Sequence, residues 1–243
     1  WPKKGRDTAM EIIRKGFAFH ISGDQHIPSL VQYGIKNYRD AGWSFVPPAI
    51  AVGYSRWFRA DEMNYPVSNR PGHGLPNTGE YRDAFGNLNY VYAIGNPGEF
   101  GGIQNRYEFQ NKKSGGFGFV IFNKDTRDIT IECWHFLSDV SNPLMGSKFQ
   151  GWPYTINQMD NYGREAVAWL PLLKINGDPD PVIQIINQST GELEYTVRIN
   201  GNEFIPKVFS RDKFSVKIGY PEKNLFREVK DIEPDLTRGT TQL

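Results

Sequence analysis

Apolar and polar residues alternate along several stretches of this chain, a pattern typical of half-buried β-strands. The clearest case is residues 128–135, where Ile129, Ile131 and Cys133 are separated by Thr130 and Glu132. An apolar stretch at residues 117–123 comes just before it, and a polar turn joins the two, so this region predicts a β-hairpin. Further short strands are expected at residues 29–35, 44–46, 49–52 and 90–94.

The N-terminal region predicts a helix followed by a strand. Asp7 or Thr8 is expected to cap the helix, Met10 and Ile12 give it an apolar side, and Gly16 follows its basic last turn. Residues 17–21 then predict a buried strand, and residues 22–26 are polar. Helix, glycine, strand and polar turn are typical of a layered α/β sheet, in which ligands bind beyond the carboxyl ends of strands.

The rest of the chain divides into irregular and β-rich parts. Residues 59–88 and 138–163 predict irregular segments, and a loop as long as the first is often functional. Residues 166–243 predict a small immunoglobulin-like β-sandwich with a frayed end over about 230–243. Its strands are expected at residues 167–170, 182–187, 193–199, 203–209 and 214–218. We therefore expect a mostly β chain with domains at residues 1–165 and 166–243.

Composition narrows the classes of protein to which this chain can belong. The chain has 243 residues, 39% of them hydrophobic, and a net charge of +1, which indicates an ordinary globular protein without an electrostatic preference for nucleic acid. No apolar run approaches the roughly 20 residues of a membrane-spanning helix. Cys133 is the single cysteine, which excludes an internal disulfide. Because the sequence starts at Trp1 without an apolar leader, we expect it to begin inside a longer sequence or after processing.

Candidate chemistry is densest after the predicted strand at residues 17–21, where His20, Asp24 and His26 lie close together. Carboxylate oxygens and imidazole nitrogens are ligands of Zn, Mn and Fe. Asp24 and His26 are two apart, so they can reach one metal site together, and Gly23 would let the backbone turn there. The other interpretation is that Asp24 and His26 are turn and capping residues and that His20 hydrogen-bonds within the core.

Other residues give weaker signals, each with a plain structural alternative. Arg56 is a candidate phosphate contact, or a surface arginine stacked on Trp57. His73 lies in the long loop, and His135 at a strand end is expected to be packed and hydrogen-bonded. The aromatic residues that could shape a substrate cleft, or pack in the core instead, are Trp43, Tyr54, Trp57 and Trp152.

The segment Gly23-Asp24-Gln25-His26 resembles the last motif of the calcineurin-like metallophosphatase superfamily, usually Gly-His-x-His. Its surroundings are similar to the PhoD-like (alkaline phosphatase D-like) branch, in which the first His of that motif is commonly Asp. The similarity extends over nearly the whole chain, and the order of its segments is what identifies it: residues 20–30, 40–50, 117–134, 151–153, 160–164, 181–186, 190–201 and 206–209.

The resemblance implies the C-terminal part of a layered metallophosphatase followed by the β-sandwich. It implies that Asp24 and His26 are metal ligands and catalytic residues in a two-metal site, whose ions (Fe, Ca, Mn or Zn, not distinguished) activate a water against a phosphate mono- or diester. It also implies a periplasmic or extracellular location. The earlier metal-binding motifs of the family are absent here, so this chain alone is expected to bind metal poorly and to be inactive.

Two other functions are compatible with the sequence. One is a non-catalytic β-rich protein that binds carbohydrate or a surface partner, suggested by the 14% aromatic content. The other is a structural module without a ligand. If the chain is such a binding protein, replacing Asp24 and His26 by alanine would leave its binding intact.

Overall fold

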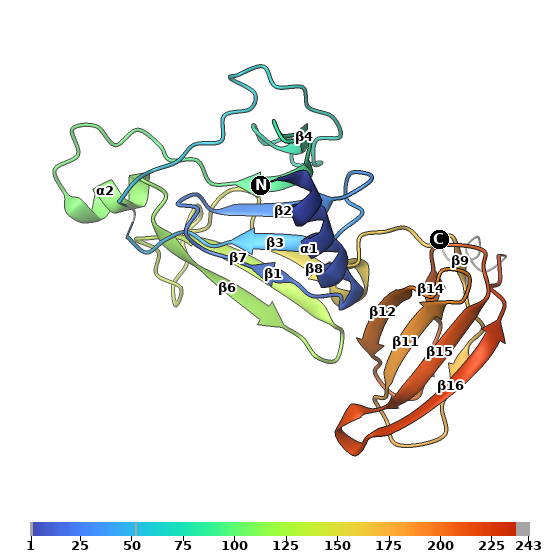
Figure 1. Cartoon of the computed structure of the whole chain (residues 1–243). Helices are drawn as coiled ribbons and strands as arrows, with labels where there is room; N and C mark the ends of the chain where they lie inside the picture. The colour runs from blue at the N-terminus through green and yellow to red at the C-terminus, as the bar shows by residue number, and fades with distance from the viewer. Residues whose placement is uncertain (1, 52, 237–243) are drawn as a thin grey trace. The chain divides into compact units, whose positions relative to one another are not determined.

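The computed structural model describes residues 2–51 and 53–236. Trp1, Val52 and residues 237–243, which include part of the predicted frayed end, lie outside it. The strand predicted at 49–52 is not formed at residues 49–51, so that prediction is wrong there. The chain is mostly β, with 34% strand and 11% helix. It forms two compact units: the first contains residues 1–11 and 19–163, and the second contains residues 12–18 and 164–243 (Figure 1).

Helix α1 (Lys3–Lys15) is longer than the pattern predicts, because it begins before Asp7. Asp7 is therefore not its cap; its carboxylate pairs with Lys3 Nζ at 2.7 Å, one turn earlier. Arg6, on the same helix, is buried and donates hydrogen bonds to the carbonyls of Gly34 and Leu88. These contacts fix the first turns of the helix on the ends of two strands.

The C-terminal end of α1 also differs from the prediction. The left-handed residue after the helix is Phe17, with φ of 51°, rather than Gly16. Phe17 is 1% exposed, and its ring packs edge-on against Tyr195 at a centroid distance of 5.2 Å within the second unit. Burial of the ring offsets the cost of a left-handed conformation at a bulky residue. The predicted strand at 17–21 is thus reduced to β1 (His20–Ile21), and Ile21 is exposed rather than buried.

A five-stranded sheet forms one layer of the first unit, in the order β1, β3, β2, β5, β4. Strand β1 runs parallel to β3, and the other neighbours are antiparallel. Strand β4 lies inside the segment predicted to be irregular, so that prediction is wrong there. The remaining bounds are β2 (Ser29–Gly34), β3 (Trp43–Val46), β4 (Gly79–Arg82) and β5 (Leu88–Ile94).

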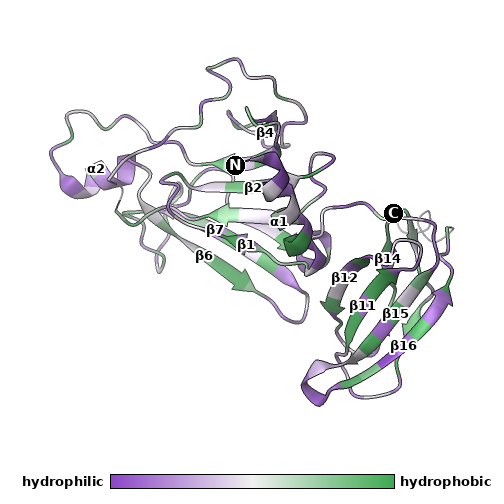
Figure 2. Cartoon of the chain, viewed as in Figure 1, coloured by the Kyte–Doolittle hydropathy of each residue, from purple (hydrophilic) through white to green (hydrophobic). Residues whose placement is uncertain are grey.

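A three-stranded antiparallel sheet forms the second layer, in the order β6, β7, β8. The predicted hairpin is confirmed as β6 (Gly116–Phe122) and β7 (Asp128–His135), with Gly118 opposite Cys133. Strand β8 (Tyr154–Asn157) and the short helices α2 (Arg106–Lys112) and η1 (Gln158–Asp160) were not expected from the pattern. Figure 2 shows β6 as pale at its start and hydrophobic toward its end, although Phe119, Ile121 and Phe122 are exposed.

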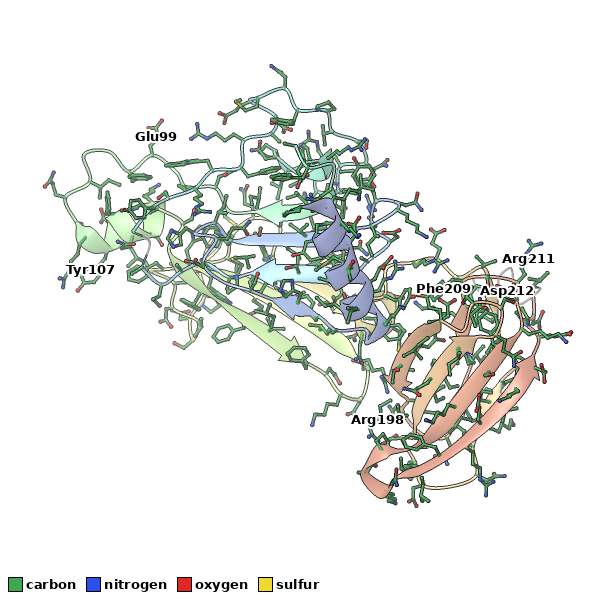
Figure 3. All side chains as sticks on the ribbon, viewed as in Figure 1. Glu99, Tyr107, Arg198, Phe209, Arg211 and Asp212 are labelled. Atoms are coloured by element: carbon green, nitrogen blue, oxygen red, sulfur yellow. The ribbon has the colours of Figure 1, made fainter. Side chains whose placement is uncertain are left out.

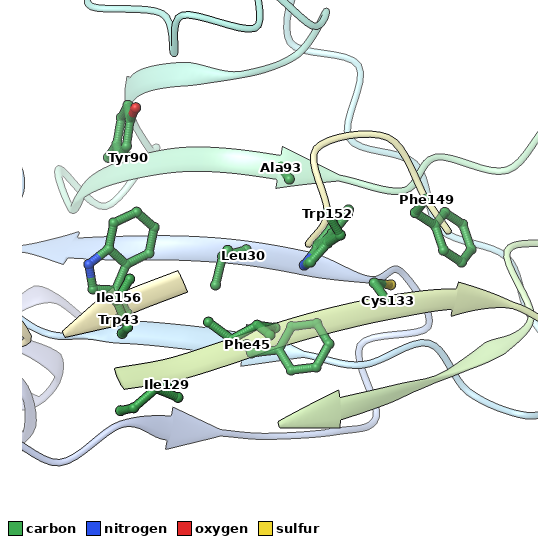
Figure 4. Close-up of a cluster of buried hydrophobic side chains, with 11 residues drawn as sticks. Leu30, Trp43, Phe45, Tyr90, Ala93, Ile129, Cys133, Phe149, Trp152 and Ile156 are labelled. Carbon is green, nitrogen blue, oxygen red and sulfur yellow. The ribbon is translucent and has the colours of Figure 1, made fainter. Parts of the chain in front are cut away.

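The core of the first unit lies between these two sheets (Figure 4). One face of the larger sheet supplies Leu30, Phe45 and Ala93, and β7 supplies Ile131 and Cys133. Leu30, Ala93, Ile131 and Cys133 are fully buried. Alternation along β7 thus places Ile129, Ile131 and Cys133 in this core, to which β2 contributes Leu30.

The long segment at residues 59–88 is fixed largely by Asp61. Its carboxylate accepts two hydrogen bonds from Arg70, at 2.9 and 3.0 Å, and one from the Asn77 backbone at 2.8 Å. The hydrogen bonds from Arg70 are the main reason that the pKa of Asp61 lies below its usual value. Burial, and next the charge of Asp61, raise the pKa of Tyr81 to about 12. This part of the chain is therefore held by a polar network next to a small apolar cluster that includes Ala60 and Tyr81.

The second unit is built on a four-stranded antiparallel sheet in the order β12, β11, β15, β16. Its core includes the buried side chains of Ile183, Ile185, Tyr195 and Val216. The strands are β11 (Val182–Asn187), β12 (Leu193–Arg198), β15 (Phe214–Tyr220) and β16 (Leu225–Ile232), with η2 (Pro221–Lys223) before the last. The β-rich nature of this region is confirmed, and an immunoglobulin-like topology stays a prediction.

Two details of the second unit correct the prediction. The single strand expected at 203–209 is two strands in different sheets: β13 (Glu203–Phe204) pairs with β10 (Leu173–Lys174), and β14 (Lys207–Val208) pairs with β9 (Ala168–Trp169). Pro206 lies between them and lacks the N–H that a continuous ladder needs. In addition, β16 occupies residues at which fraying was expected.

Candidate functional site

The candidate metal ligands follow β1. The backbone N–H of Ser22 donates to the Phe45 carbonyl at 3.1 Å and extends the pairing with β3 by one residue. The chain then bends, with left-handed conformations at Asp24 (φ 62°) and His26 (φ 57°). Gly23 was expected to make this turn, but its φ is not in the left-handed range and no atom lies near its missing Cβ. The strain of the turn therefore resides in the two candidate ligands themselves.

Asp24 and His26 lie close to each other. The Nε2 atom of His26 is 3.6 Å from the Asp24 carboxylate, whose side chain is fully exposed. The other ring nitrogen, Nδ1, is 2.9 Å from the carbonyl oxygen of Tyr54. Because a carbonyl only accepts, Nδ1 carries a proton in this contact, and Nε2 of the neutral ring keeps its lone pair. A histidine fixed in this way presents a free nitrogen beside a carboxylate, as metal-ligating histidines do.

Two other histidines of the first unit, His73 and His20, have protein partners of a different kind. His73 Nδ1 accepts from the Leu75 N–H at 3.1 Å, and its Nε2 lies 2.9 Å from the Tyr92 carbonyl, so both of its nitrogens have protein partners. His20 Nδ1 lies 3.3 Å from the Ser44 hydroxyl and 3.4 Å from the Tyr33 hydroxyl. His20 thus hydrogen-bonds inside the fold, which is the structural alternative that its sequence position allows.

The donor atoms of Asp24 and His26 suit a divalent metal ion, but two ligands alone do not complete a metal site. Within residues 2–51 and 53–236, no group of at least three His, Cys, Asp or Glu side chains is arranged to hold a metal ion. Two donors fit one side of a coordination sphere. A tightly bound ion would need further ligands.

Arg56 and the candidate aromatic residues are separated by the fold. Arg56 is exposed. The guanidinium group that lies over the Trp57 ring belongs to Arg59, 5.6 Å from the ring centre, so the prediction that Arg56 stacks on Trp57 is wrong. Trp43 and Trp152 are 6% and 7% exposed and belong to the core between the sheets. Only Tyr54 and Trp57, 80% and 44% exposed, are placed to meet a ligand.

Sequence reasoning missed a cavity beside the end of β7. It has a volume of about 540 Å³, and its lining includes Lys112, His135, Met145 and Phe149. His135 was expected to be packed and hydrogen-bonded. Its ring does stack on Phe149, with centroids 3.8 Å apart, but its buried Nδ1 has no hydrogen-bond partner among the described residues. The only signal in the sequence was a histidine at a strand end before a loop of small polar residues.

The cavity and the Asp24–His26 pair lie at the same end of the first unit. The Gly116 N–H, at the start of β6, donates to the carbonyl of Ala49, which follows β3. Gly116 is also paired with His135 at the end of β7. Lys113 joins the two regions, since its Nζ donates to the Gly53 carbonyl at 2.9 Å. Segments that follow β1, β3 and β7 are therefore neighbours in space.

No family model, curated protein or solved structure matches this chain. A relationship to PhoD-like metallophosphatases therefore stays a prediction from the sequence motifs. The helices in the described part of the chain are too short or too polar to cross a membrane.

Proposed function

We propose that this chain supplies one side of the metal centre of a PhoD-like phosphoesterase. The observation that carries the proposal is the contact between His26 Nδ1 and the Tyr54 carbonyl, which leaves Nε2 free at 3.6 Å from the Asp24 carboxylate. A metal ion in such a site supplies an acidified water for attack on a phosphate ester. Asp24 and His26 would hold the ion, and the Tyr54 carbonyl fixes the tautomer of His26.

A metal titration tests the proposal on the chain as it exists. Calorimetric titration with Zn²⁺ or Mn²⁺ is expected to show weak saturable binding that is lost in His26→Ala and in Asp24→Ala. His73→Ala is the matched control, because both nitrogens of that ring already have protein partners. Equal metal binding by wild type and His26→Ala would contradict the assignment.

The catalytic part of the proposal needs the remaining ligands. In a protein that combines this chain with them, His26→Ala is expected to abolish nearly all hydrolysis of an aryl phosphate and to lower the metal content measured by elemental analysis. An unchanged rate together with unchanged metal content would refute the catalytic role of His26.

Carbohydrate binding without catalysis is a second candidate, and one observation favours it. Trp57 is 44% exposed and stacks on Phe100 with centroids 6.1 Å apart. A flat, partly exposed aromatic pair can receive the apolar face of a sugar ring. On this hypothesis Trp57→Ala weakens binding in a glycan array, whereas His26→Ala leaves it unchanged.

A further inference from the structure

The cavity beside β7 has the dimensions of a small-molecule site. Its volume of about 540 Å³ lies within the range of roughly 300–1,000 Å³ that is usual for ligand pockets. Leu144, Met145 and Phe149 give it apolar walls, and Lys112, Ser114 and His135 give it polar groups. An inorganic ion would leave most of this space unfilled, so the cavity suits an organic molecule.

His135 carries the strongest indication of a missing partner. Its ring is held against Phe149, and its buried Nδ1 is left without a hydrogen bond in the part of the chain that the structure describes. A buried polar atom without a partner destabilises the folded state. Proteins seldom retain such an atom unless a ligand, an ion or a water satisfies it.

The charges around the cavity indicate what kind of ligand would suit it. Lys112, at the end of α2, forms no ion pair with a carboxylate among the described residues. The one acidic residue of the lining, Asp139, is engaged elsewhere: it accepts from the Ser141 hydroxyl at 2.6 Å and from the Ser141 N–H at 2.9 Å. Lys112, which has no carboxylate partner in the described part of the chain, and His135 therefore line the same space, which favours a negatively charged oxygen group.

We propose that this cavity binds a small organic molecule that carries an oxyanion, either a phosphate or a carboxylate. Lys112 and the ring of His135 contact the oxyanion, and Phe149 and Met145 contact the organic body. This site uses none of the residues of the Asp24–His26 pair, so it stands independently of the metal-site proposal.

Binding measurements with four probes test this site. Phenyl phosphate and benzoate carry an aromatic body with either oxyanion, benzamide is the neutral analogue, and inorganic phosphate lacks the body. At low salt and with a chelator present, we expect phenyl phosphate or benzoate to bind with a Kd of about 1 mM or lower. The imidazole NMR signals of His135 should shift on binding, and which probe binds more tightly identifies the oxyanion.

Two variants and two controls complete the experiment. Lys112→Met keeps the apolar stem and is expected to weaken binding about tenfold. His135→Phe keeps a ring on Phe149, removes the nitrogen and is expected to weaken binding as well. Lys124→Met, on the exposed turn between β6 and β7, and His26→Ala should both bind like wild type.

Several results would overturn the proposal. Absence of binding by both aromatic anions would refute the site, and equally tight binding of benzamide would refute the role of charge. If inorganic phosphate bound as tightly as phenyl phosphate, the organic body would have no part in recognition. Wild-type affinity in Lys112→Met would remove the lysine from the site.

Discussion

The two candidate sites of the first unit differ in what fixes their side chains. Asp24 and His26 lie on an exposed bend, and one hydrogen bond to the Tyr54 carbonyl orients the imidazole. His135 ends a paired strand and stacks on Phe149, which is 5% exposed and part of the core. The first site has recognisable chemistry and little support from packing. The cavity beside His135 is supported by packing against the core and has a defined shape, but its residues form no recognisable sequence motif.

This difference predicts opposite responses to substitution. Changes at Phe149, the buried part of the cavity wall, should affect stability and binding together, because this residue is also part of the core. Changes in the exposed bend should affect binding alone, because few packing contacts depend on it.

The largest expected effect is that of Phe149→Ala. Removing a buried aromatic ring typically costs about 3–5 kcal/mol of unfolding free energy, and here it also removes the ring that holds His135. Urea denaturation would measure the loss, and titration with phenyl phosphate is expected to show that binding disappears.

Met145→Ala is the matched control for that variant. Met145 lines the same cavity, but its side chain is fully exposed, so its replacement should change stability by no more than about 0.5 kcal/mol. A loss below about 1 kcal/mol in Phe149→Ala would show that the cavity wall is not part of the core, and the contrast between the two sites would fail.

A smaller effect of opposite sign is expected for Asp24→Gly. Asp24 is held at φ of 62°, which glycine adopts without a steric penalty. The substitution should raise the unfolding free energy by up to about 1 kcal/mol and at the same time weaken metal binding. Such a trade of stability for function is common at binding sites.

Asp125→Gly serves as the control for Asp24→Gly, since Asp125 also lies in an exposed turn but has an ordinary negative φ. The Asp125→Gly variant should not have a higher unfolding free energy than wild type. If Asp24→Gly destabilised the chain, the left-handed bend after β1 would not be under strain.

The smallest effect concerns the pH dependence of stability. Burial, and next the positive charge of Lys112, lower the pKa of His135 below its ordinary value of 6.5. The unfolded chain then takes up a proton at a pH at which the folded chain does not. Stability is therefore complete above about pH 6.5 and falls as the pH drops toward the lower pKa of the folded state.

The variant His135→Phe lacks this titrating group and should lose less stability between about pH 7.5 and about pH 5.5 than wild type does. Denaturation midpoints at the two pH values would measure the difference. Lys112 and Asp139 are the charged groups that line the same cavity, and both are kept in this variant. Equal losses in the two proteins would show that His135 titrates as an exposed histidine does.

Sequence patterns predicted the strands that bury one face. The strands β2, β7, β11 and β12 lie close to their predicted positions. In β7 and β11 the alternate residues Ile129, Ile131, Cys133, Ile183 and Ile185 are apolar because they are buried in a core. The closeness of Asp24 and His26 also followed from the sequence, since they are two residues apart. These features depend on neighbours along the chain, which the sequence displays directly.

Tertiary structure alone decided the remaining elements. Strand β16 is exposed at nearly every position and is held by backbone pairing to β15, so it shows no hydrophobic alternation. Phe17 adopts a left-handed conformation because its ring is buried against Tyr195, a residue far away in the sequence. The His135 cavity is formed by α2, the end of β7 and the loop at 137–149, which only the folded chain brings together. Contacts between distant segments have no local signature, and for that reason the sequence could indicate candidate ligands but not the cavity at the same end of the unit.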